Sequence, residues 1–199
     1  MMYFQSGSEN TVIRAGDLEY GVNSALDKLG NKKKVLVIPP DFTRFHSRAG
    51  EITGLIYKYY KENLKDILPA LGTHVPMTHH ELDCMFKGVP KELFRVHDWR
   101  KDVVTVGTVP GEYISELTNG ALDYSWPAQL NKLVFNGGHD LILSVGQVVP
   151  HEVIGMANYN KNLFVGTGGP EGINKSHFVG AVFGMEKIMG IADNPVRKM

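Results

Sequence analysis

The chain lacks several features that would assign it to particular classes of protein. It has one cysteine, Cys84, among 199 residues, which excludes an internal disulfide framework and fits a reducing compartment. Its 21 basic and 21 acidic side chains give a formal net charge of zero, so no charge imbalance attracts nucleic acid or an anionic membrane. No run approaches about 18 apolar residues, and the N-terminus lacks the basic start and apolar core of a signal peptide. We therefore expect a cytoplasmic protein with neither a nucleic-acid nor a membrane partner.

Apolar runs that alternate with segments of helical spacing indicate the fold class. With 43% hydrophobic and 21% charged residues, the composition is that of an ordinary globular protein. The alternation is typical of βαβ units and predicts an α/β fold with a mostly parallel sheet and flanking helices. The runs at 35–38 and 141–145 further indicate buried strands. We predict strands over residues 35–38, 67–71, 94–97, 103–106 and 141–145, and helices over residues 17–29, 49–64 and 78–86.

Side chains with catalytic potential follow three of the predicted strands. Because the carboxyl ends of parallel strands lie at one edge of a sheet, we expect these side chains to meet there. Each alone has a structural explanation, since Asp41 and Thr43 can cap a turn, Arg44 can pair with Asp41, and a histidine can bind a backbone carbonyl. Their occurrence after three separate strands favours a functional site. The residues are Asp41, Thr43 and Arg44 after the first strand, His74 after the second, and His151 after the strand at 141–145.

The chemistry of these side chains suits a reaction at a stereocentre. Arg44 offers a planar fork for a carboxylate or phosphate. His74 and His151 can act as general base and general acid on opposite sides of a substrate carbon, as inversion of a stereocentre requires. Downstream, Lys161 can serve as an ammonium group or, if desolvated, as a nucleophile, and His177 can bind a metal ion.

The order and spacing of several motifs between residues 35 and 177 resemble one known family, the nickel-pincer-nucleotide-dependent lactate racemases. The resemblance implies a Rossmann-like N-terminal domain of a two-domain protein. It also implies an isomerase that moves a hydride from the α-carbon of a 2-hydroxy acid to the cofactor and returns it to either face of the 2-oxo acid. The motifs are Asp41-x-Thr43-Arg44, Ala70-Leu71-Gly72-Thr73-His74, Met77-Thr78-x-x-Glu81-Leu82, His97-Asp98, Gly146-x-x-x-Pro150-His151, Lys161 and Asn174-x-x-His177.

The resemblance also implies a role for each site residue. The cofactor would be the nickel complex of pyridinium-3,5-bisthiocarboxylic acid mononucleotide, joined to the chain through a thioamide bond, and the enzymes that make it would be partners. The substrate would be a small 2-hydroxy acid such as lactate. By position, His74 and His151 match the acid/base pair, Lys161 the attachment point, His177 the nickel ligand, Asp41 and Thr43 cofactor-binding residues, and Arg44 a residue that binds cofactor and substrate carboxylate.

The chain departs from the family pattern in two ways. The approach to Lys161 is usually rich in glycine, whereas here it reads Gly155-Met156-Ala157-Asn158-Tyr159-Asn160, so we expect bulkier side chains along the approach, which leaves open a lactate-like substrate other than lactate itself. Family members also carry a C-terminal domain that closes the cleft, and this chain stops at Met199. Residues 1–199 are therefore expected to form an incomplete N-terminal catalytic and cofactor-binding domain, weakly active alone.

Two other functions are compatible with the same residues. A zinc-dependent hydrolase or lyase would place His74, His151 and His177 around the metal, with Lys161 stabilising charge. A non-catalytic ligand-binding domain is the other alternative, given the missing half.

Overall fold

A short buried strand forms the centre of the main sheet. The structure, a computed structural model, describes all residues from Met1 to Met199. The four residues of β1 (Val35–Ile38) are fully buried, and β1 pairs in parallel with β2 (Leu64–Ile67) on one side and β5 (Leu141–Ser144) on the other. All four residues of this strand can be apolar because protein covers both faces of the sheet at β1.

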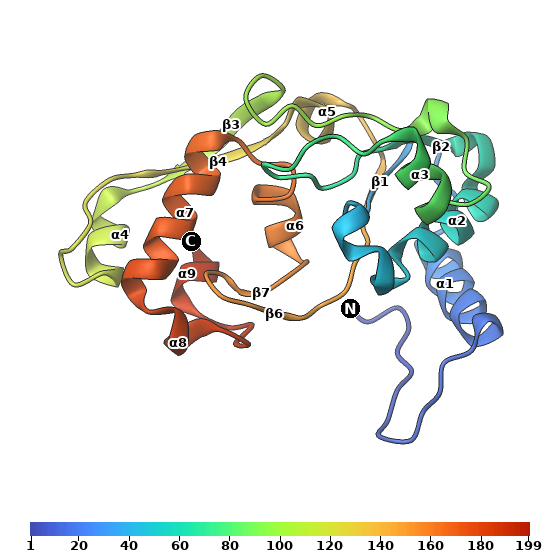
Figure 1. Cartoon of the computed structure of the whole chain (residues 1–199), viewed down its shortest axis with the longest axis horizontal. Helices are drawn as coiled ribbons and strands as arrows, with labels where there is room; N and C mark the ends of the chain where they lie inside the picture. The colour runs from blue at the N-terminus through green and yellow to red at the C-terminus, as the bar shows by residue number, and fades with distance from the viewer.

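Helices from the first half of the chain cover one face of this sheet and form a first lobe (Figure 1). These are α1 (Ala15–Leu29), α2 (Ala49–Tyr60) and α3 (His79–Met85). As predicted, α1 is followed by Gly30, whose φ of 72° suits glycine. The side chain of Thr78 caps α3 and forms the predicted capping box with Glu81. Short 3-10 helices η1 (Phe42–Ser47), η2 (Lys61–Asn63) and η3 (Lys91–Leu93) connect these elements.

A second lobe has its own core and its own antiparallel strands. Strand β3 (Val103–Val109) pairs with β4 (Trp126–Asn131), and α4 (Gly111–Leu117) connects them. Strands β6 (Pro150–His151) and β7 (Gly155–Met156) form a second antiparallel pair. The indole nitrogen of Trp126 donates to the carbonyl of Gly172, 2.8 Å away, and joins β4 to α7. The remaining helices of this lobe are α7 (Pro170–Phe183), α8 (Met185–Ile188) and α9 (Pro195–Lys198).

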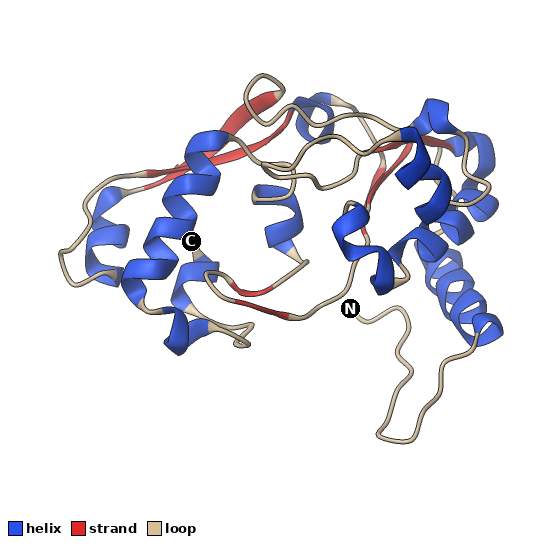
Figure 2. Cartoon of the chain, viewed as in Figure 1, coloured by secondary structure: helices blue, strands red, loops and turns tan.

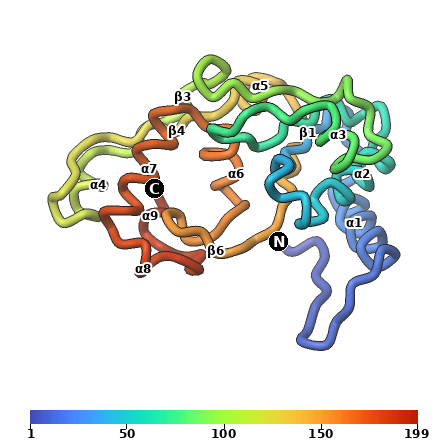
Figure 3. The backbone as a smooth tube through the Cα atoms, in the orientation of Figure 1, coloured from blue at the N-terminus to red at the C-terminus, as the bar shows by residue number.

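The helix α6 (Asn160–Phe164) lies between the two lobes (Figure 1). Leu163 packs against the second face of the main sheet, where Leu36 and Ile38 are buried together with side chains of α5 (Lys132–Asn136). The next residue, Phe164, packs into the core of the second lobe, with its ring centre 5.9 Å from that of Trp126. Two adjacent side chains thus hold α6 against both lobes. Strand β4 also continues directly into α5, and loops make the other connections between the lobes (Figures 2 and 3).

The predicted fold class is confirmed, and several element boundaries were wrong. The second strand begins at Leu64 rather than at residue 67. Beyond its end, the backbone N–H groups of Leu68 and Ala70 still donate to the carbonyls of Val37 and Pro39. The segment 94–97 makes only a single bridge at Phe94, whose ring packs against Phe86. The strand β5 is at the edge of the sheet, so its side chains are only partly buried, and Ile142 is 37% exposed. The helix predicted over 49–64 ends at Tyr60, because η2 turns the chain into β2.

None of the helices combines the length and the apolar character that a membrane crossing requires.

Candidate active site

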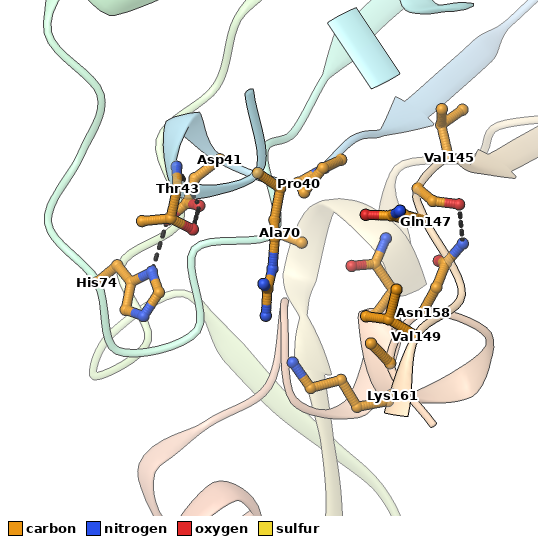
Figure 4. A pocket seen from close by; sticks show the side chains of 14 residues that line it. Pro40, Asp41, Thr43, Ala70, His74, Val145, Gln147, Val149, Asn158 and Lys161 are labelled. Atoms are coloured by element: carbon orange, nitrogen blue, oxygen red, sulfur yellow. Dashed lines mark hydrogen bonds and ion pairs between the residues drawn. The ribbon is translucent and has the colours of Figure 1, made fainter. Parts of the chain in front are cut away.

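A pocket at the carboxyl ends of the main strands brings together five of the predicted site residues (Figure 4). They come from the loop after β1, the loop after β2 and the first turn of α6. The sheet places the first two loops at the same edge, as parallel topology requires. The five residues are Asp41, Thr43, Arg44, His74 and Lys161, and Gly146, Gln147, Asn158 and Asn162 are among the other residues that line the pocket.

Asp41 and His74 form a closely hydrogen-bonded pair. Nδ1 of His74 donates to Oδ2 of Asp41 over 2.6 Å, while the other carboxylate oxygen accepts from the backbone N–H and the hydroxyl of Thr43. The carboxyl group of Asp41 is buried, whereas 57% of the His74 side chain is exposed. Because Nδ1 carries the hydrogen, the neutral ring keeps its lone pair on Nε2, where it can accept a proton. Asp41 therefore pairs with His74 and not with Arg44.

Arg44 and Lys161 are two cations without protein partners. Both line the pocket, and neither side chain forms a hydrogen bond or an ion pair with another residue. Burial lowers the pKa of the Lys161 amine, and the nearby Arg44 guanidinium lowers it further, while Glu152 and Asp41 oppose the shift. The Lys161 side chain extends from α6 toward the side of the pocket that holds Asp41 and His74 (Figure 4). The pocket can therefore bind an anion and offers an amine that deprotonates more readily than usual.

His151 lies beside this pocket rather than in its wall. It is buried in β6, and the backbone N–H of Val153 donates to its Nδ1 over 3.3 Å, which leaves the hydrogen of the neutral ring on Nε2. Burial, followed by the positive charge of Lys161, lowers the pKa of His151 to about 4; Glu152 opposes this shift, and His177 and Arg44 add to it. His151 is thus a neutral imidazole at neutral pH, and the positive charges of Lys161 and Arg44 both contribute to its low pKa.

His177 has the hydrogen-bond pattern of a metal-binding histidine. Its Nδ1 donates to the carbonyl of Ile173, 2.8 Å away on the same helix, so the lone pair is on Nε2. Burial lowers its pKa, which favours the neutral form that binds metal. Its ring lies edge-on to that of His151, with the ring centres 5.9 Å apart.

No three His, Cys, Asp or Glu side chains converge on one point as metal ligands. A zinc site with three protein ligands, as the hydrolase alternative requires, is therefore not formed by His74, His151 and His177. A single histidine suits a metal that receives most of its ligands from an organic group, so His177 and Lys161 fit the cofactor that the resemblance implies.

The sequence did not identify the amide network that attaches α6 to the sheet. The side-chain nitrogen of Asn162 donates to the carbonyl of Ile38 and to the hydroxyl of Ser144, both at 3.0 Å. Asn158 accepts from the Ser144 hydroxyl and donates to the carbonyl of Gly146, both at 2.9 Å. Only the density of asparagines around Lys161 hinted at this network, because its partners lie far away in the sequence.

Two residues shortly before Lys161, Asn158 and Tyr159, adopt backbone conformations that are typical of glycine. Asn158 has a φ of 60° and Tyr159 a φ of 52°, in the left-handed region that favours glycine. Asn158 lines the pocket, as the prediction of bulkier side chains implies. The Tyr159 ring does not line it and is 54% exposed.

Comparison with known proteins agrees with this geometry. Residues 6–189 match the family model described as lactate racemase N-terminal domain. A crystal structure of a protein from Thermotoga maritima is 29% identical, with a TM-score of 0.81, and the match covers 93% of this chain and 46% of that one. The lactate racemase apoprotein of Thermoanaerobacterium thermosaccharolyticum is 25% identical, with a TM-score of 0.63 and coverage of 95% and 42%. The chain thus spans less than half the length of these solved structures. No curated protein matches it.

Proposed function

Because the chain belongs to the lactate racemase N-terminal domain family, we propose that it provides the cofactor-binding and proton-transferring part of a racemase or epimerase of a lactate-like 2-hydroxy acid. One observation carries the proposal: His74, oriented by Asp41, shares a pocket with two unpaired cations, Arg44 and Lys161. Since the chain spans less than half of the related structures, the activity is proposed for the protein together with whatever completes the cleft.

Arg44 would bind the carboxylate of the substrate. Its guanidinium is exposed, lines the pocket and has no competing acidic partner, so two of its N–H groups can donate to both oxygens of one carboxylate. A 2-hydroxy acid held in this way would have its hydroxyl one carbon away from the carboxylate. Other residues of the cleft would select the length and shape of the substrate's own side chain.

His74 would accept the proton of the substrate hydroxyl. Its Nε2 has the free lone pair, and the Asp41 carboxylate stabilises the imidazolium that forms. His151 would take the corresponding role for the mirror-image substrate, which requires its ring hydrogen to move from Nε2 to Nδ1 and its contact with the Val153 N–H to be given up. Two imidazoles on different elements, one after β2 and one in β6, can approach a substrate from two sides.

Lys161 and His177 would hold the cofactor. The Lys161 amine would form the covalent attachment, Nε2 of His177 would bind the nickel, and Asp41, Thr43 and Arg44 would line the cofactor and substrate space. When bound, the nickel-pincer nucleotide would supply the hydride acceptor and donor that the reaction needs.

The charge on Lys161 links attachment to acid/base chemistry. The Lys161 ammonium is the second-largest cause, after burial, of the low pKa of His151. Conversion of the amine into an amide-like group would remove that charge. The pKa of His151 would then rise toward the range in which a histidine can exchange protons at neutral pH.

Mass spectrometry of the loaded chain tests the proposal. The chain is expressed with the cofactor-making enzymes and nickel, and the T. thermosaccharolyticum lactate racemase is loaded in the same cells as a positive control. We expect an adduct that maps to Lys161, bound nickel in equal amount, and neither in Lys161→Met. An unmodified Lys161 beside a loaded control protein would contradict the attachment. Interconversion of lactate enantiomers is then assayed with the loaded protein.

A further inference from the structure

Arg197 in α9 contacts the segment that leads to Lys161, and it lies beyond the residues that match the family model. Its Nη1 donates to the carbonyl of Met156 over 2.8 Å, and its Nη2 donates to the carbonyl of Asn158 over 3.3 Å. The guanidinium carbon also lies 4.8 Å from the ring centre of Tyr159. One side chain thus contacts three residues of the segment 156–159.

The contacted segment has a backbone conformation that its residues do not favour. Tyr159 combines a φ of 52° with a ψ of −140°, a region populated almost only by glycine. Tyr159 is also the residue before α6, and Lys161 is the second residue of that helix. The conformation at Tyr159 therefore sets the direction in which the first turn of α6, and with it Lys161, leaves the loop.

Arg197 is itself held firmly in place. Its backbone N–H donates to the side chain of the buried Asn194 over 2.9 Å, and Asn194 in turn donates to the carbonyls of Ile154 and Ile191. The neighbouring Val196 is buried in the core of the second lobe. An anchored guanidinium can restrain a loop because its own position does not adjust to that loop.

We propose that Arg197 is a positioning residue for Lys161. It binds the carbonyls of Met156 and Asn158 and the Tyr159 ring, and so holds the segment in the glycine-type conformation that directs the lysine into the pocket. The Asn158 side chain restrains the same segment from the side of the sheet through Gly146 and Ser144. The contacts of Arg197 thus stabilise a backbone conformation that glycine would adopt without such contacts. The importance of this role for cofactor attachment rests on the proposed function, whereas the positioning itself does not.

The test measures the amine of Lys161 directly and needs no cofactor. The chain is labelled with trace acetic anhydride across a range of pH, and mass spectrometry reports the labelling of each lysine. Arg197→Lys retains the positive charge but loses the two-carbonyl contact, so we expect the labelling midpoint of Lys161 to move upward toward that of an ordinary lysine. Adding Tyr159→Gly should return the midpoint to that of Tyr159→Gly alone, because glycine adopts the required backbone without restraint.

The matched control is Arg100→Lys, because the guanidinium of Arg100 also lies over an aromatic ring, that of Trp99, but makes no contact with this segment. It should leave the Lys161 midpoint unchanged. An unchanged midpoint in folded Arg197→Lys, or a glycine variant that fails to restore it, would overturn the proposal. If Arg197→Lys does not fold, the double variant must fold and keep the low midpoint. None of these outcomes depends on nickel or racemase activity, so failure here is distinct from failure of the proposed function.

Discussion

The two lobes contribute different halves of the site, and they do so by different means. In the first lobe, Asp41 and His74 follow strands that lie side by side in the sheet, and their hydrogen bond completes the pair. In the second lobe and in α6, His151 lies in β6, Lys161 in α6 and His177 in α7, and burial together with neighbouring charges lowers the pKa of each. Sheet topology thus provides the hydrogen-bonded pair of Asp41 and His74, and burial beside neighbouring charges provides the groups whose pKa is lowered.

The substitution Asp41→Asn tests the hydrogen-bonded pair of Asp41 and His74 in the first lobe. An amide at position 41 can donate to Nδ1 of His74, which would move the ring hydrogen to Nε2, the atom that must accept a proton. We expect the proposed racemase activity, measured with cofactor-loaded protein, to fall by about 10²–10⁴-fold. Nitrogen-15 NMR of His74 should show the changed tautomer even without cofactor.

Asp83→Asn is the matched control, since Asp83 is a surface carboxylate that pairs with Lys91. It should change neither activity nor the His74 tautomer. The role of Asp41 would be refuted if His74 kept its tautomer in Asp41→Asn.

Ile114→Ala tests whether the second lobe depends on its own core. Ile114 is fully buried in that core, so its truncation should lower the free energy of unfolding by about 2–5 kcal/mol, measured by denaturant titration. Hydrogen exchange should accelerate more in α4 and β4 than in β1. The exposed Ile13→Ala provides the control and should change stability by about 0.5 kcal/mol or less. Equal loss of protection in both lobes would show that they unfold as one unit.

The dependence of stability on pH should reflect the neutral state of buried His151. Its pKa of about 4 in the folded protein is below its ordinary value of 6.5, so acidification protonates the unfolded chain first. The contribution of this group is complete above about pH 6.5 and is lost as the pH falls toward 4, with a total on the order of 3 kcal/mol. Comparison with His151→Gln isolates the effect, and parallel pH profiles for the two proteins would argue against it.

Lys161→Met should produce the smallest of these effects, an upward movement of the pKa of His151. The substitution removes a positive charge that disfavours the imidazolium, while burial, the larger cause, remains. Titration of the His151 ring by NMR measures the change. Lys198→Met removes an exposed lysine that pairs with Asp193 and should leave the pKa in place. A pKa of His151 that does not change in Lys161→Met would show that the two side chains are not electrostatically coupled.

Sequence patterns placed the side chains that follow the main strands more reliably than the boundaries of the elements around them. The run 35–38 and the capping box at Thr78 were placed correctly because each depends on neighbouring residues alone. The segment 94–97 has the pattern of a strand but makes only one bridge, because the ring of Phe94 packs into the core. The antiparallel pairing of β3 with β4 was not predicted, because β4 was not among the predicted strands and the pattern of β3 alone does not identify its partner.

The candidate site likewise has features that local sequence indicates and features that depend on distant residues. The sequence alone indicated which side chains follow strand ends, and the parallel arrangement of those strands then brings Asp41 and His74 to one edge. It could not reveal that Arg44 and Lys161 lack partners, that two histidine rings meet edge-on, or that Arg197 holds the approach to Lys161. Local residue order determines where a strand stops and which side chain comes next. Burial, pairing and charge depend on groups distant in the sequence, and only the packed lobes bring these groups together.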